Sequence, residues 1–274
     1  MIKKIFEKHE TLICIMLIVM YVVMNSYCLK DLGSTDYRSA IINTIFSIAL
    51  FALIFALDRR SYYGLVKIEN WKKFLYFIPL LLISSTNLWN GIHIENTAGE
   101  IVFHVIMMIN VGFIEEVIFR GFLFKMIAKD NMKSAIIISS LTFGMGHIVN
   151  LLRGAAFVST LLQMCYATAI GYLFVVIFLK SKSLIPCIIS HAVINSLSIL
   201  PKSSEVVYAG AIFLIVVPLI YAIYINKTIK ELNRKCMFSS FLCAHYVVYV
   251  LGSENGGHGK IQQFRGVERK WKRK

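Results

Sequence analysis

Charged residues are scarce in this chain. Asp, Glu, Lys and Arg make up only 16% of its 274 residues, whereas 57% are hydrophobic. A soluble globular domain carries about 25% charged residues, so the composition excludes a soluble protein with an ordinary polar surface. Apolar runs of about 20 residues are typical of membrane-spanning helices. The sequence therefore predicts an all-α, polytopic transmembrane helical bundle in the cell membrane.

Cysteine pairs with metal-site or redox spacing are also missing. The chain contains Cys14, Cys28, Cys165, Cys187, Cys236 and Cys243. They lie in or beside apolar runs, and no two have the C-x-x-C spacing. This pattern indicates neither a disulfide framework nor a cysteine metal site. We interpret the cysteines as small, buried hydrophobic residues.

The apolar runs predict about eight spans. These are residues 11–29, 40–57, 73–91, 101–126, 134–152, 157–179, 184–200 and 206–225. The first run is longer than the core of a signal peptide, and no small-residue cleavage site follows it, so we interpret it as a span. Residues 1–235 then form the bundle. Residues 236–274 are predicted to be an apolar interfacial segment followed by a basic tail that contacts anionic lipid.

Acidic residues are few, and the basic residues are unevenly distributed. With the N-terminus placed in the cytoplasm, the outer segments carry only Lys30, Arg38, Arg153 and Lys202. The inner segments carry Lys3, Lys4, Lys8, Arg59, Arg60, Lys67, Lys72, Lys73, Lys125, Lys129, Lys133, Lys180, Lys182, Lys227, Lys230, Arg234 and Lys235. Such a bias is the positive-inside rule, which predicts cytoplasmic N- and C-termini. The net charge of +14 therefore reflects topology, and no nucleic-acid partner is expected.

One apolar run contains three charged residues. The stretch "GFIEEVIFRG" (112–121) places Glu115, Glu116 and Arg120 inside the fourth predicted span, where each charge costs about 2.5–3.5 kcal/mol on insertion scales. Glu116 and Arg120 are four residues apart, so they share a helix face and can pair. Glu115 points elsewhere and has no partner within its own helix. An unpaired carboxylate in a membrane indicates a functional site; charges that only lock helices together are the alternative.

Two further spans carry buried polar groups. His147 lies in the fifth span, one turn after Phe143, and the nearby Gly144 and Gly146 would let another backbone approach closely. His191 and Asn195 lie four residues apart on one face of the seventh span. Either histidine alone would more often be a hydrogen-bonded core residue than a catalyst. Their combination with Glu115 favours a catalytic site.

The segments "EEVIFR" (115–120), "FGMGH" (143–147) and "HAVIN" (191–195) together resemble the EExxxR, FxxxH and HxxxN motifs of a protease family. This is the CAAX prenyl protease 2 and bacteriocin-processing (CPBP or Abi) family of intramembrane proteases. The three motifs occur in the family's order, and the resemblance covers a catalytic core at about residues 100–200.

The resemblance implies an intramembrane endopeptidase with defined roles for these residues. By this likeness Glu115 activates water, His147 assists, and His191 with Asn195 stabilises the oxyanion. Glu116, Arg120 and Phe143 would support the site. The family is commonly described as metalloproteases, so zinc bound by Glu115, His147 and His191 is a family expectation. Yet HExxH is absent, and a water activated by glutamate and histidine is chemically sufficient without metal.

The three motifs leave several substrates and two other functions open. The resemblance implies a membrane-embedded peptide or a lipidated protein as substrate, either in CAAX-type processing or in bacteriocin maturation and self-immunity. A non-catalytic immunity protein that binds a peptide toxin would use the same fold. Buried Glu, Arg and His would also suit a proton-coupled transporter, but the four prolines show no matching broken spans in two halves.

Overall fold

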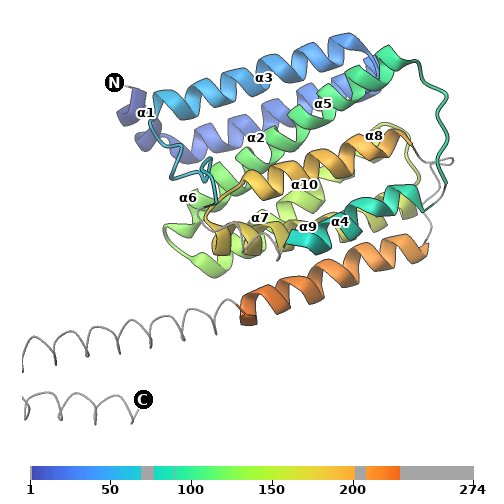
Figure 1. The fold of residues 1–274 in the computed structure, drawn as a ribbon. Coiled ribbons are helices and arrows are strands. Elements are labelled where there is room, and N and C mark those ends of the chain that lie inside the picture. Colours follow the sequence, from blue (N-terminus) through green and yellow to red (C-terminus); the bar gives the residue numbers. More distant parts are fainter. Residues whose placement is uncertain (1, 69–76, 90, 201–207, 229–274) are drawn as a thin grey trace, which may run out of the picture. The chain divides into compact units, whose positions relative to one another are not determined.

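The computed structural model describes residues 2–68, 77–89, 91–200 and 208–228, and its secondary-structure elements are helices (Figure 1). Apart from the last two residues of the helix Tyr208–Thr228, the elements described here belong to one compact unit, Met1–Asn226. The predicted interfacial segment and basic tail, residues 236–274, lie outside the described residues.

Six helical segments are long and apolar enough to cross a membrane. They follow the short helix α1 (Ile2–Lys8) and confirm the prediction of a multi-pass, all-helical membrane protein. They are α2 with η1 (Glu10–Tyr27, Cys28–Leu32), α3 (Tyr37–Ala56), α5 with η4 and α6 (Ala98–Glu116, Val117–Leu123, Phe124–Ala128), α7 with η5 and α8 (Met132–Met145, Gly146–Ile148, Val149–Leu152), α9 (Phe157–Ser181), and Tyr208–Thr228.

Two of the eight predicted spans correspond to shorter helices. The run 73–91 contains α4 (Ile78–Ser85) and η3 (Thr86–Leu88), and the run 184–200 contains α10 (Ile185–Ser196) and η6 (Leu197–Ile199). At about 1.5 Å per residue, the longer of these apolar helices, Ile185–Ile199, extends only about 22 Å. A bilayer core is about 30 Å thick. Of the described helices, six therefore qualify as spans by length.

Polar side chains at the helix starts explain where several elements begin. The Asp36 side chain accepts a hydrogen bond from the backbone N–H of Arg38 and caps α3. Thr97 and Glu100 form a reciprocal capping box that starts α5. Pro186 lies in the first turn of α10, where its missing N–H costs no helical hydrogen bond.

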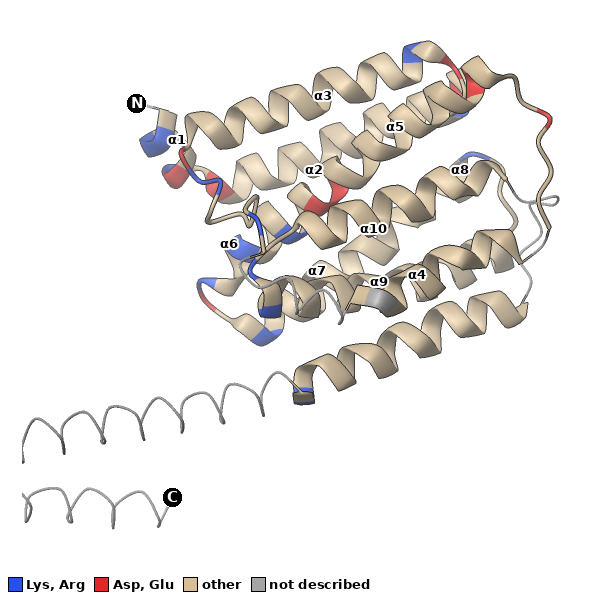
Figure 2. Ribbon diagram, viewed as in Figure 1, with Lys and Arg blue, Asp and Glu red and all other residues tan. Residues whose placement is uncertain are grey.

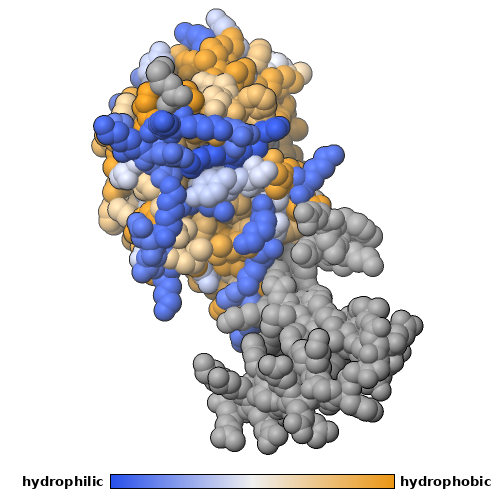
Figure 3. All heavy atoms as spheres, turned by 90° about the vertical axis from the view of Figure 1, so that its left-hand side faces the viewer, coloured by the Kyte–Doolittle hydropathy of each residue, from blue (hydrophilic) through white to orange (hydrophobic). Residues whose placement is uncertain are grey.

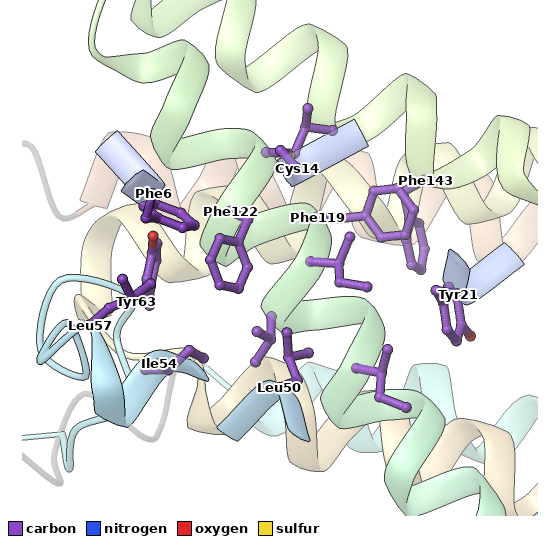
Figure 4. Close-up of a cluster of buried hydrophobic side chains, with 14 of the residues drawn as sticks. Phe6, Cys14, Tyr21, Leu50, Ile54, Leu57, Tyr63, Phe119, Phe122 and Phe143 are labelled. Atoms are coloured by element: carbon purple, nitrogen blue, oxygen red, sulfur yellow. The ribbon is translucent and has the colours of Figure 1, made fainter. Parts of the chain in front are cut away.

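The bundle is organised around α5. Helices α3 and α10 pack against α5, and α7 packs against α9 (Figure 1). Buried aromatic rings fill the space around η4, where Phe119 lies 5.6 Å from Phe143 and Phe122 lies 4.5 Å from Tyr63 between ring centroids (Figure 4). Large apolar side chains such as Ile45 and Ile48 of α3 are exposed, as expected for helices that face lipid.

Basic side chains gather at one end of the bundle, where the N-terminus lies (Figures 2 and 3). Ion pairs connect the elements there: Arg59 contacts Glu7 at 2.6 Å, and Lys129 pairs with Glu10. This grouping brings together segments that the charge distribution had assigned to one side of the membrane.

A glycine allows α7 and α9 to approach closely. A Cβ on Gly144 would collide with the Thr168 side chain and would lie 2.6 Å from the backbone oxygen of Met164. The predicted role of Gly144 in close packing is therefore confirmed. The same prediction for Gly146 was wrong, because a Cβ there meets no atom within 4 Å.

We expect Gly144→Ala to destabilise the protein, because the α9 backbone would have to move. Overpacking of this kind costs roughly 1–3 kcal/mol, so the melting temperature in detergent should fall. Gly146→Ala is the matched control and should melt like the wild type. Equal melting temperatures for all three proteins would contradict this packing.

Candidate active site

The two glutamates lie at the junction between α5 and a π-helix. Helix α5 ends at Glu116, and the next seven residues, Val117–Leu123, form η4. All side chains of η4 are buried. π-helical turns are rare, and they occur frequently at functional sites. Figure 2 shows the pair as an acidic stretch inside the bundle.

Glu116 is held in a fully buried ion pair. Its Oε1 accepts a hydrogen bond from Nη1 of Arg120 at 3.1 Å and lies 2.9 Å from Nδ1 of His191. The Glu116 and Arg120 side chains are both 0% exposed. A buried charge is tolerated when it is paired and hydrogen-bonded, so Glu116 has a structural environment that links α5, η4 and α10.

Arg120 also lies against aromatic rings. Its guanidinium carbon is 3.9 Å from the ring centroid of Phe143 and 5.6 Å from that of Phe174. Its Nε and Nη2 atoms have no hydrogen-bond partner among the described residues. Attraction to the ring faces therefore supplements the ion pair, since a desolvated cation over an aromatic face gains about 2 kcal/mol.

Glu115 has a different environment. The Tyr21 hydroxyl of α2 donates a hydrogen bond to Glu115 Oε1. Glu115 Oε2 lies 3.6 Å from Nε2 of His191. The Glu115 side chain is 13% exposed, against 0% for Glu116. One carboxylate is therefore enclosed by the protein, and its neighbour reaches a cavity.

That cavity brings the predicted site residues together. It has a volume of about 410 Å³, and its lining includes Glu115, His147, His191 and Asn195. The ring of Phe143 lies edge-on to both imidazoles, with centroid distances of 6.1 Å to His147 and 5.5 Å to His191. Residues from α5, η5 and α10 thus line one space, and Phe143 of α7 packs against both histidine rings.

The end of α10 is fixed by side chains from two other elements. Nδ2 of Asn87 donates to the backbone oxygen of Ile194 at 2.6 Å. Nε2 of His104 lies 3.3 Å from the backbone oxygen of Asn195, and its Nδ1 lies 3.0 Å from Oγ of Ser34. His104 is thus a hydrogen-bonded core residue that helps to position the turn carrying Asn195.

The donor groups do not fit a tightly held zinc ion as they are arranged. Among the described residues, no group of three His, Cys, Asp or Glu side chains is placed to hold a metal. Glu115 Oε1 accepts a hydrogen bond from Tyr21, and Nδ1 of His191 contacts Glu116, which leaves Oε2 and Nε2 facing each other at 3.6 Å. As placed, Glu115, His147 and His191 line one cavity but are not arranged as the three ligands of a zinc site.

Tyr21 and the π-helix were not predicted from the sequence. Tyr21 lies in the first span, 94 positions from Glu115, and belongs to none of the motifs. One signal could have identified it: a tyrosine away from the ends of a span needs a partner for its hydroxyl when buried. The π-helix leaves no such signal, because the hydropathy of Val117–Leu123 does not distinguish it from an α-helical part of the same span.

The buried pair predicts a difference between the two glutamates. Glu116→Gln leaves the Arg120 charge without its partner, and breaking a buried ion pair costs about 3–5 kcal/mol. The yield of folded protein and the melting temperature in detergent should both fall. Glu115→Gln keeps the shape of a side chain that faces the cavity and should melt close to the wild type. If Glu116→Gln is as stable as Glu115→Gln, the structural role of Glu116 is refuted.

Comparison with known proteins gives one match. Residues 97–197 match the family model described as Type II CAAX prenyl endopeptidase Rce1-like. No curated protein and no solved structure matches the chain significantly. The matched range contains all three motifs and every predicted site residue from Glu115 to Asn195. Residues 97–197 therefore form a domain of the Rce1-like type II CAAX prenyl endopeptidase family.

Proposed function

We propose that this protein is an intramembrane endopeptidase that hydrolyses a peptide bond in a membrane-embedded or lipid-modified peptide. The main support for the proposal is that the two adjacent glutamates have different environments. Glu116 is locked into a fully buried ion pair, whereas Glu115 reaches a cavity shared with two histidines. Family membership of residues 97–197 supports a peptidase.

In the proposed reaction a water molecule lies between Glu115 and His147. The Tyr21 hydroxyl occupies one carboxylate oxygen, which leaves Oε2 to accept a proton from the water. The resulting hydroxide attacks the peptide carbonyl carbon and forms a tetrahedral oxyanion. When the C–N bond breaks, the proton held by Glu115 passes to the leaving amine. General acid–base assistance of this kind contributes about 10²–10⁴-fold.

His191 and Asn195 are proposed to stabilise the oxyanion. Nδ1 of His191 donates to the carboxylate of Glu116; in the proposed step the ring is imidazolium, with a proton on each nitrogen, so that Nε2 donates into the cavity. The amide of Asn195 is the second donor, and the contacts to Asn87 and His104 fix the turn that carries it. One such donor is typically worth about 10²–10³-fold in rate.

The substrate is proposed only at the level of its class. The family name refers to CAAX prenyl substrates, and a lipid attached to a peptide could remain in the bilayer while the peptide enters the cavity. Transmembrane peptides, bacteriocin precursors included, fit the same description. Two probes separate these classes: a farnesylated peptide ending in a CAAX sequence, and a hydrophobic helical peptide without lipid.

The activity test compares Glu115→Gln with the wild type on both probes, using mass spectrometry to detect cleavage. We expect the rate per folded molecule to fall by at least about 10²-fold, because the proton acceptor is lost while the shape is kept. Glu116→Gln is the matched control, and any loss there should follow the loss of folded protein. Normal cleavage by Glu115→Gln, with folded but inactive Glu116→Gln, would reverse the proposed roles.

We further propose that α4 and α10 complete crossings of the bilayer inside the bundle, which gives eight crossings with both the N-terminus and residue 230 in the cytoplasm. The charge distribution along the chain supports this topology. Shielding by neighbouring helices would let a short helix cross, since protein rather than lipid surrounds part of its length.

Labelling of single cysteines tests this topology in intact cells, on a background without native cysteine. Ile94→Cys, in the loop before α5, should react with a membrane-impermeant maleimide. Lys67→Cys, on the proposed cytoplasmic side, should react only after permeabilisation. Both positions are exposed, so the two cysteines differ only in the side of the membrane on which they are proposed to lie. Labelling of Lys67→Cys, but not of Ile94→Cys, in intact cells would invert the topology.

A further inference from the structure

The cavity has a second polar region besides the one that contains Glu115. Its lining includes Asn150, Arg153 and Gln163, which come from α8, the turn after it and α9. Nδ2 of Asn150 donates to Oε1 of Gln163 at 2.6 Å, and Nη2 of Arg153 donates to Oδ1 of Asn150. These contacts orient the guanidinium along the cavity wall. Among the lining residues, Arg153 is the one Lys or Arg side chain and Glu115 is the one carboxylate.

The charge of Arg153 is not neutralised within the described part of the chain. None of the ion pairs found there includes Arg153. Burial lowers the pKa of its guanidinium. Arginine nevertheless stays protonated in proteins. A partly desolvated cation beside a cavity is a receptor for an anionic group, because pairing recovers part of the desolvation cost.

The distance between Arg153 and the proposed reaction centre limits which anionic groups could bind there. Arg153 follows His147 by six positions along η5 and α8, or about 9 Å along the axis at 1.5 Å per residue. An extended peptide covers that distance in two or three residues at roughly 3.3–3.6 Å each. An anionic group on the substrate itself can therefore reach Arg153 while a nearby peptide bond is attacked.

We propose that Arg153 binds a carboxylate of the substrate two or three residues from the scissile bond. The planar guanidinium can hold a carboxylate through two parallel hydrogen bonds, with Asn150 holding the arginine in place. The carboxylate is either the chain terminus or an acidic side chain. The placement of the scissile bond rests on the proposed function, but carboxylate binding can be measured without cleavage.

The test uses full-length Glu115→Gln protein in detergent, so that bound peptides stay intact. Three N-palmitoylated, fluorescent heptapeptides of otherwise identical sequence serve as probes. The first ends in a free carboxylate, the second in an amide, and the third in an aspartate with an amidated terminus. Fluorescence anisotropy gives the Kd of each. At least one carboxylate peptide should bind roughly 10- to 100-fold more tightly than the amide peptide.

Substitutions of Arg153 on the same background assign the effect. Arg153→Gln should make the affinities of the three peptides equal, and Arg153→Lys should retain part of the preference because it keeps the charge without the planar fork. Arg60→Gln is the matched control: Arg60 is exposed, lies over Phe55 and does not line the cavity. It should retain the full preference.

A preference that depends on Arg153 supports the proposal, and the preferred peptide identifies terminal or side-chain recognition. Equal affinities for all three peptides, no measurable binding, or a preference that survives in Arg153→Gln would overturn it. Wild-type protein given the same peptides reports cleavage separately. Binding that depends on Arg153 without any cleavage would keep the carboxylate site and reject the proposed hydrolysis.

Discussion

The buried pair of Glu116 and Arg120 is the interaction on which the rest of the site depends. Moving two charges out of water costs several kcal/mol per ion, and this pair is enclosed completely. Its cost is offset by contacts from other helices: the ring of Phe143 on α7, the ring of Phe174 on α9 and the imidazole of His191 on α10. The pair therefore connects four helical segments. Removal of either charge would leave the other buried in an apolar interior without its partner.

The arrangement also explains why two adjacent glutamates have different roles. Neighbouring residues on a helix point about 100° apart. If Glu116 points toward Arg120 and α10, Glu115 must point toward α2 and the cavity. The π-helix begins directly after this pair, and wider turns of this kind alter the direction of the following side chains without breaking the span. His191 lies between the two carboxylates, 2.9 Å from Glu116 and 3.6 Å from Glu115. The same imidazole therefore contacts both the structural Glu116 and the proposed catalytic Glu115.

Much of this could be predicted from the sequence, because it depends on local spacing. The pairing of Glu116 with Arg120 follows from their separation of four residues, and the structure contains it. Hydropathy identified the six long spans. The features that were missed depend on contacts between distant parts of the chain. The hydrogen bond from Tyr21 to Glu115 joins α2 and α5. Gly144 packs closely against α9, and Gly146 does not. The π-helix and the shorter α4 and α10 do not alter the apolar composition, so hydropathy alone could not reveal them.

In the proposed mechanism Glu115 directs a water molecule onto a peptide carbonyl. A single-turnover reaction in H₂¹⁸O distinguishes this attack from one by the carboxylate itself, with enzyme in excess over the farnesylated or the helical peptide. Mass spectrometry of the product and of the tryptic fragment containing Glu115 shows where the label goes. Direct attack by water predicts one ¹⁸O atom in the new carboxyl terminus and none in the enzyme. Label in Glu115, with an unlabelled product, would reveal a covalent intermediate on that residue, and either this result or the absence of cleavage of both probes would contradict the account.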